Sequence, residues 1–211
     1  MISRLHYITQ DLPDFSHSQL AEFACKGGAD WIQLRVKNKT YDEWLKIAEE
    51  VKLVCKKFGA TLIINDNVII AKEISTDGVH LGKEDMNPKE ARKILGNNFI
   101  IGGSTNTMED VKWQMANGCD YIGLGPFRHT TTKEKLNPIL GLDGIKTIAE
   151  KFGDKIPMIA IGGIKLEDVE SLMQSGIHGV AVSSAINLSE NKTDATNKLI
   201  HELHKFTLIH P

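Results

Sequence analysis

The sequence lacks several features that would place it in a membrane or outside the cell. No apolar run is long enough to span a bilayer, and the N-terminal stretch from Met1 to Tyr7 has no apolar core of the kind that secretory signals carry. The three cysteines, Cys25, Cys55 and Cys119, are far apart, odd in number and without a CxxC pair. This usage is typical of reduced, mostly buried thiols rather than a disulfide frame or a zinc site. We therefore predict a soluble, cytoplasmic protein.

An excess of charge of either sign is also missing. The 25 lysines and arginines nearly balance 27 acidic residues, which leaves a net charge of −2. Such a chain has no global attraction to nucleic acid or to an anionic membrane, so we expect neither as a partner. An anionic substrate would have to be bound by local basic residues. A Walker A motif is absent, and Gly123–Pro126 lacks the third glycine and the following helix of a dinucleotide fingerprint.

Short apolar runs alternate with amphipathic stretches along the chain. Most runs are continuous and rich in Ile or Val, as in strands that are buried on both faces of a parallel sheet. We predict eight strands, centred on Leu5–Ile8, Trp31–Arg35, Thr61–Asn65, Gly78–Leu81, Phe99–Gly102, Tyr121–Leu124, Met158–Ile161 and Gly179–Val182.

The segments between these strands carry helix signals. Thr40–Glu43 is a capping box, the helix that follows should end near Gly59, and Asn87-Pro88 begins another helix. Eight strands with intervening helices predict an α/β fold, a single (β/α)₈ TIM-barrel domain over residues 1–211. The alternative is an open doubly wound sheet, which would gather ligand groups at one switch point. Polar clusters follow many of the strands here, which favours the barrel.

The first polar cluster is basic. If the second strand ends at Leu34, Arg35 and Lys37 lie on one side of the extended chain and could clamp a pyrophosphate. A solvated basic loop is an equally good interpretation of this pair alone.

Two aspartates follow the next two strands. Asp66 could be part of a helix cap, but Asp85 after the fourth strand would converge with it at the barrel mouth. Two carboxylates that are completed by substrate phosphate oxygens suit Mg²⁺. His80 lies within a strand beside apolar residues, and we interpret it as structural.

Glycines and hydroxyl residues follow the remaining strands. Ser104-Thr105 and Thr130–Lys133 could bind phosphate, and the polar stretch from Thr130 to Pro138 could close over the site as a lid. Gly162-Gly163 after the seventh strand and Ser183-Ser184 after the eighth occupy the positions of the phosphate site that recurs in these barrels.

Taken together, these segments resemble the thiamine phosphate synthase family over about residues 5 to 187. The matching landmarks are QLRVK at Gln33–Lys37, IND at Ile64–Asp66, GVHLGKED at Gly78–Asp85, IGGST at Ile101–Thr105, DYIGLGP at Asp120–Pro126, TTTK at Thr130–Lys133 and AIGGI at Ala160–Ile164.

The resemblance implies a magnesium-dependent transferase of thiamine biosynthesis. It would join hydroxymethylpyrimidine diphosphate to thiazole phosphate and release pyrophosphate. The resemblance assigns the pyrimidine diphosphate to Gln33, Arg35, Lys37, Asn65 and Lys133, with Ser104 on the pyrimidine. It assigns Mg²⁺ to Asp66 and Asp85, and the thiazole phosphate to Thr130, Thr132, Gly163, Ser183 and Ser184. Arg35, Lys37 and Lys133 would be catalytic because they neutralise the leaving pyrophosphate.

Three residues depart from the family pattern: Val36, where glutamate is frequent, Asn106, where histidine is frequent, and Ser183, where an apolar residue is usual. Two alternatives stay open. One is a thiazole tautomerase, whose catalytic histidine would stand where this chain has Pro126. The other is a catalytically silent sensor. The sequence leaves the oligomeric state open, although barrels of this kind often form homodimers.

Overall fold

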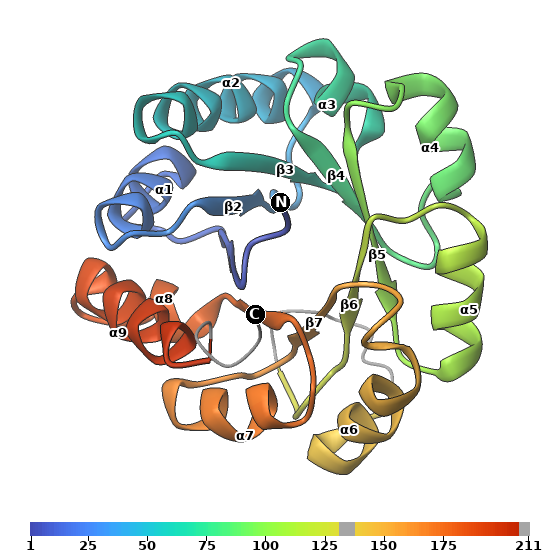
Figure 1. Cartoon of the computed structure of the whole chain (residues 1–211). Helices are drawn as coiled ribbons and strands as arrows, with labels where there is room; N and C mark the ends of the chain where they lie inside the picture. The colour runs from blue at the N-terminus through green and yellow to red at the C-terminus, as the bar shows by residue number, and fades with distance from the viewer. Residues whose placement is uncertain (131–137, 207–211) are drawn as a thin grey trace.

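Eight parallel strands close into a barrel in chain order, and β8 pairs with β1 (Figure 1). The computed structural model describes residues 1–130 and 138–206. The strands are β1 (Leu5–Ile8), β2 (Trp31–Leu34), β3 (Thr61–Asn65), β4 (Gly78–Leu81), β5 (Ile100–Thr105), β6 (Tyr121–Leu124), β7 (Met158–Ile161) and β8 (Gly179–Val182). The predicted TIM barrel is confirmed, and the open sheet is excluded by the β1–β8 pairing.

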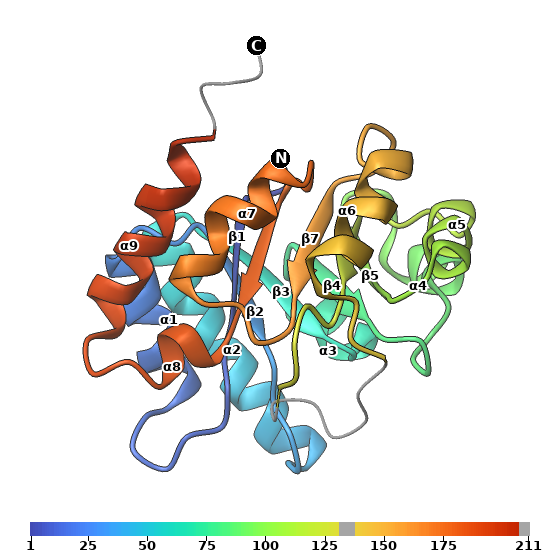
Figure 2. The same cartoon turned by 90° about the horizontal axis from the view of Figure 1, so that it is seen from below.

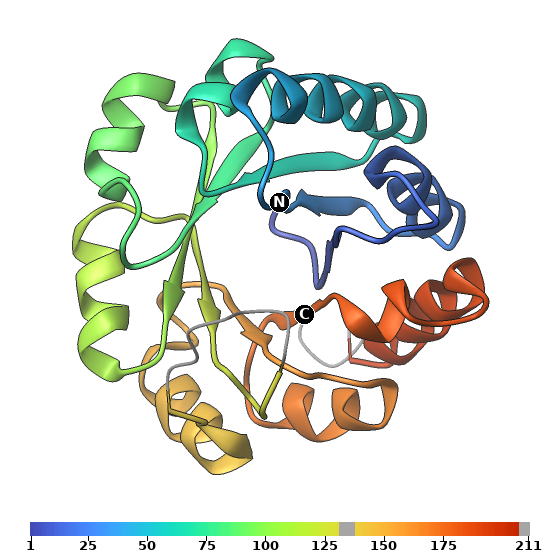
Figure 3. The ribbon, with the colours of Figure 1, turned by 180° about the vertical axis from the view of Figure 1, so that it is seen from behind.

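Helices surround the barrel on its outside (Figures 1 and 3). They are α1 (His17–Lys26), α2 (Tyr41–Phe58), α3 (Val68–Glu73), α4 (Pro88–Leu95), α5 (Met108–Ala116), α6 (Gly141–Phe152), the 3-10 turn η1 (Leu166–Asp168), α7 (Val169–Gln174), α8 (Ser184–Asn187) and α9 (Lys192–His204).

The predicted helix boundaries are confirmed by the hydrogen bonds at the helix ends. The Thr40 side chain accepts from the backbone N–H of Glu43, and Gly59 ends α2 in the left-handed conformation at φ +69°. The Asn87 side chain caps α4, in which Pro88 is the first residue. These caps satisfy backbone groups that have no partner within the helix.

Two strands differ from their predicted ranges. β2 ends at Leu34, because the next backbone N–H, that of Arg35, donates to the Thr9 hydroxyl at 3.1 Å. β5 continues to Thr105, because Ser104 and Thr105 pair with Gly123 and Leu124 of β6. Both differences place a polar residue at the carboxyl end of the barrel.

Large side chains fill the inside of the barrel. Trp31 and Tyr121 are fully buried, their rings meet edge to face at 5.5 Å, and His6 stacks on Trp31 at 4.2 Å. Gly102 leaves room for this layer, because a Cβ there would lie 2.2 Å from Cζ of Tyr121. The filled interior leaves space for a ligand only at the ends of the barrel.

Figure 2 shows the barrel from the side, with α8 at one end and the N-terminus at the other. In the described residues, no helix is both long and apolar enough to cross a membrane. Cys25 and Cys55 are buried, Cys119 is half-buried, and all three are free thiols. The prediction that the cysteines are mostly buried is thus confirmed.

Candidate functional site

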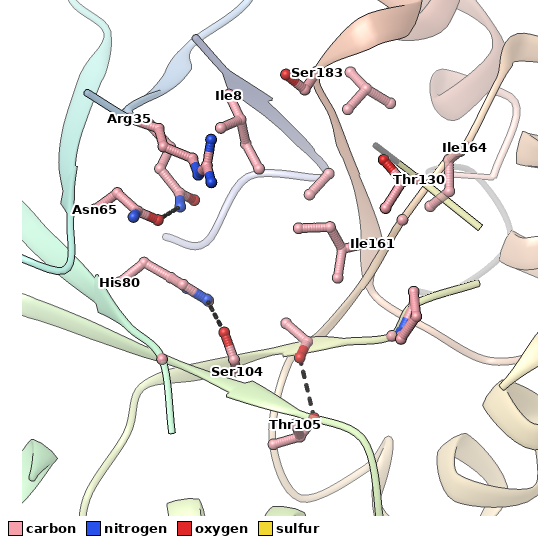
Figure 4. Close-up of a pocket in the computed structure, with 18 of the residues that line it drawn as sticks. Ile8, Arg35, Asn65, His80, Ser104, Thr105, Thr130, Ile161, Ile164 and Ser183 are labelled. Atoms are coloured by element: carbon pink, nitrogen blue, oxygen red, sulfur yellow. Dashed lines mark hydrogen bonds between the residues drawn. The ribbon is translucent and has the colours of Figure 1, made fainter. Parts of the chain in front are cut away.

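A cavity of about 380 Å³ lies at the carboxyl ends of the strands (Figure 4). Every strand or the loop after it contributes to its wall, from Ile8 at the end of β1 to Ser183 and Ser184 after β8. Loops at this end of such barrels are the usual position of an active site.

The structure brings ten of the predicted site residues to this cavity. These are Gln33, Arg35, Asn65, Asp66, Asp85, Ser104, Thr130, Gly163, Ser183 and Ser184. Lys37 does not line the cavity and lies farther along the loop that begins at Arg35. Thr132, Lys133 and most of the expected lid fall outside the described residues.

Gln33 and Asn65 form one side of the cavity. Gln33 Nε2 donates to Asn65 Oδ1 at 2.8 Å, so the two amides, from adjacent strands, fix each other's orientation. Arg35 lines the same cavity and lies near Asn65, as Figure 4 shows. A guanidinium next to two oriented amides is suited to bind a negatively charged, oxygen-rich group.

The two aspartates lie in different local structures. Asp66 has a left-handed φ of +67°, and its N–H donates to the His80 carbonyl at 2.8 Å. Asn67, rather than Asp66, caps α3 by accepting from the N–H of Ile70. The capping alternative for Asp66 is therefore wrong, and its carboxylate lies at the mouth of the cavity without that task. A non-glycine residue at positive φ costs free energy and is often found at a functional site.

Asp85 closes the turn after β4. Its Oδ2 accepts the N–H of Gly82 at 2.6 Å, which holds one carboxylate oxygen in the turn. Within the described residues, no group of three or more His, Cys, Asp or Glu side chains could hold a metal ion alone. Asp66 and Asp85 both line the cavity, and the metal-binding role that the sequence predicts for them stays a prediction.

His80 lines the cavity, which the sequence interpretation as a structural histidine did not predict. Its Nδ1 lies 3.0 Å from the Tyr121 hydroxyl and its Nε2 lies 3.1 Å from Ser104 Oγ. Alternation along β4 could have indicated this position, because neighbouring side chains of a strand point to opposite faces. Because both faces of β4 are buried, the neighbours Val79 and Leu81 are apolar, and the sequence does not distinguish the face that points to the cavity.

Glycines and serines form the opposite side of the cavity. Gly162 and Gly163 have φ values of +106° and +66°, and a Cβ on Gly163 would lie 2.5 Å from Cγ of Arg128. The Arg128 guanidinium forms an ion pair with Asp168 at 2.5 Å. This pair joins the loop after β6 to η1, and only glycine leaves room for the Arg128 side chain at position 163.

The three residues that depart from the family pattern have structural roles that differ. Val36 is buried, and Asn106 Nδ2 donates to the carbonyls of Gly125 and Pro138, both at 2.9 Å. Ser183 Oγ accepts from Asn187 Nδ2 at 3.0 Å. Asn106 and Ser183 therefore replace the usual side chains with hydrogen bonds that brace loops around the cavity.

Comparison with known proteins agrees with this geometry. The family model for thiamine monophosphate synthase matches residues 5–186. A thiamine-phosphate synthase of Flavobacterium johnsoniae is 47% identical over 212 residues, which cover 99% of this chain and 100% of that protein. One of Flavobacterium psychrophilum is 48% identical over 208 residues, with 97% and 99% covered.

Among solved structures, the thiamine phosphate pyrophosphorylase of Pyrococcus furiosus superposes with a TM-score of 0.87 at 31% identity, and 96% of each chain is covered. None of these relatives supports the tautomerase or the sensor alternative. The barrel is closed, residues from several of the matching landmarks line one cavity, and relatives match the chain over nearly its whole length. The chain therefore belongs to the thiamine monophosphate synthase family.

Proposed function

We propose that the protein joins hydroxymethylpyrimidine diphosphate to thiazole phosphate, giving thiamine phosphate and pyrophosphate. The observation that carries this proposal is the two-sided cavity. Arg35, Asp66 and Asp85 line it at one side, and Gly163 and the serines after β8 line it at the other. A cavity with two separate sets of groups for phosphate suits a reaction between two phosphorylated substrates.

Mg²⁺ fits the donor set on the first side. Asp66 and Asp85 supply hard carboxylate oxygens at the cavity mouth, and substrate oxygens would complete the coordination of an ion that retains few protein ligands. When bound, the ion would offset the negative charge of the diphosphate.

The chain's own residues would do the remaining work. Gln33 and Asn65 orient the pyrimidine diphosphate, Ser104 contacts the pyrimidine, and Arg35, Lys37 and Lys133 neutralise the charge that develops on the leaving pyrophosphate. The carbon–oxygen bond to pyrophosphate breaks, and the thiazole nitrogen, held near by its phosphate, forms the new carbon–nitrogen bond. Because the substrate supplies both reacting atoms, the protein needs to position them rather than provide a nucleophile.

Pyrophosphate release from the two substrates, with and without Mg²⁺, tests the proposal. We use Asp66→Asn as the variant, because asparagine tolerates positive φ and therefore removes the charge while the backbone conformation is kept. Asp154→Asn, at an exposed position before β7, is the matched control. We expect release to require both substrates and Mg²⁺ and to fall at least about a hundredfold in Asp66→Asn alone. Absence of release from folded wild-type protein would refute the proposed reaction.

A further inference from the structure

A buried histidine outside the cavity joins the two loops that follow β1 and β2. His17 is the first residue of α1 and is 6% exposed. Its Nδ1 lies 2.8 Å from Thr9 Oγ1, and its Nε2 lies 3.2 Å from Asp11 Oδ1. Both ring nitrogens therefore contact side chains of the loop between β1 and α1.

The same two side chains hold the loop that carries the cations. Thr9 Oγ1 accepts the backbone N–H of Arg35 at 3.1 Å, and Asp11 Oδ2 accepts the backbone N–H of Lys37 at 3.1 Å. His17 is thus one side chain away from the backbone of both residues. Thr9 is fully buried, so this arrangement is shielded from water on the Arg35 side.

The donors and acceptors in this network define one set of proton positions. Backbone N–H groups can only donate and an ionised carboxylate can only accept, so Nε2 of His17 donates to Asp11. A neutral imidazole then leaves Nδ1 as an acceptor for the Thr9 hydroxyl, whose oxygen still accepts from Arg35. Burial lowers the pKa of His17, although the Asp11 carboxylate opposes this shift. The neutral form that the network needs is the form that burial favours.

The start of α1 does not require the His17 side chain. Ser16 caps the helix, and its side chain and that of Gln19 form a reciprocal capping box. A histidine at this position therefore has no capping task of its own. The two ring nitrogens of His17 contact Thr9 and Asp11. These two side chains in turn accept the backbone N–H groups of Arg35 and Lys37.

We propose that His17 is a positioning residue, which holds the backbone of Arg35 and Lys37 through Thr9 and Asp11 so that the cations meet the diphosphate. The inference rests on the proposed function, because it needs these cations to bind the pyrophosphate group. His17 itself does not line the cavity, so it would act through Thr9 and Asp11 and not by contact with a substrate.

Three substitutions separate the two arms of the network. His17→Phe fills the same space and removes both hydrogen bonds. His17→Gln can still donate to Asp11, and His17→Asn can still accept from Thr9. Ser16→Ala is the control, because it weakens the start of α1 and leaves the network intact.

Steady-state kinetics with each substrate varied in turn gives the readout. In His17→Phe we expect the KM for the pyrimidine diphosphate to rise about tenfold, while the KM for the thiazole phosphate stays within about twofold. His17→Gln and His17→Asn should each recover part of this loss. Ser16→Ala should lower the melting temperature and leave both KM values unchanged.

Calorimetry with inorganic pyrophosphate and Mg²⁺ gives a second readout, in which His17→Phe should weaken binding by a similar factor. If wild-type protein is active and His17→Phe changes the melting temperature but neither KM nor pyrophosphate affinity, His17 is structural and the inference is wrong. If folded wild-type protein releases no pyrophosphate, the proposed function falls, and the inference falls with it.

Discussion

Removal of one buried hydroxyl tests how Ser104 is oriented. The Tyr121 hydroxyl lies 3.0 Å from Nδ1 of His80. On the other side of the ring, His80 Nε2 lies 3.1 Å from Ser104 Oγ, and Figure 4 shows this second contact. Burial raises the pKa of Tyr121 well above its ordinary value, so the phenol keeps its proton and can donate it to Nδ1. Nε2–H then donates to Ser104, whose own O–H is left to point at a substrate.

Tyr121→Phe keeps the ring and removes this donor. The loss of a buried hydrogen bond should lower the free energy of unfolding by about 1–3 kcal/mol. Without the phenol, the His80 ring can place its proton on Nδ1 and accept the Ser104 proton instead. The serine would then have no proton for the substrate, and kcat/KM for the pyrimidine diphosphate should fall by about tenfold, the equivalent of ~1.4 kcal/mol.

The assay compares denaturant unfolding and pyrophosphate release in Tyr121→Phe with those in Tyr41→Phe. Tyr41 is an exposed phenol on α2 that donates to Glu73 Oε2, so the control makes the same chemical change away from the cavity. In the control, we expect the free energy of unfolding to change by less than about 0.5 kcal/mol and kcat/KM to stay the same. A Tyr121→Phe protein that is destabilised but retains wild-type kcat/KM would refute the proton assignment on Ser104.

Two further predictions concern the glycine loop and acid stability. Gly163→Ala should raise the KM for the thiazole phosphate at least about tenfold, because the new Cβ would lie 2.5 Å from Arg128 Cγ. Gly118→Ala is the control, because Gly118 also has a positive φ, +78°, but has open space around it. This control should lower the free energy of unfolding by only about 1 kcal/mol and leave the activity unchanged. Equal kinetics in the two variants would contradict this reasoning. Burial lowers the pKa of His6, His17 and His178. Below about pH 6.5 these histidines take up protons in the unfolded chain but stay neutral in the native state. The free energy of unfolding should therefore decrease as the pH is lowered, by up to about 1.4 kcal/mol per pH unit per histidine. Urea unfolding between pH 7.5 and 5 measures this slope, and His201→Asn, at an exposed position, should leave it unchanged. A free energy of unfolding that does not change with pH would show that these histidines accept protons in the native state.

The barrel could be predicted from the sequence because its signals are local. Continuous apolar runs mark strands that are buried on both faces, and a helix cap such as Thr40 or Asn87 lies within three residues of its partner. The residues after each strand converge because closure brings all strand ends to one mouth. Ten predicted site residues could therefore be placed without knowledge of any single contact.

The supporting contacts could not be predicted in the same way, because their partners are distant along the chain. His80 and Tyr121 are 41 residues apart, and Thr9 meets the Arg35 N–H across 26 residues. Sequence periodicity shows that such a position is buried and leaves its partner undefined. Alternation after β2 predicts the side of the chain on which Lys37 lies, but not which residues line the cavity, and Lys37 is not among them.

Barrel closure contributes directly to the order of the site. β8 pairs with β1, and Asn187 after β8 donates to the Ile8 carbonyl of β1 at 3.0 Å while it also donates to Ser183 Oγ. The Tyr7 hydroxyl of β1 donates to the Oδ1 of the same asparagine at 2.5 Å. Ser183 is therefore oriented by groups from the opposite end of the sequence, which reach it only when the first and last strands meet. An open sheet with the same residues would leave β1 and β8 apart and would lose this support, so the closed topology is a requirement for the serine side of the cavity.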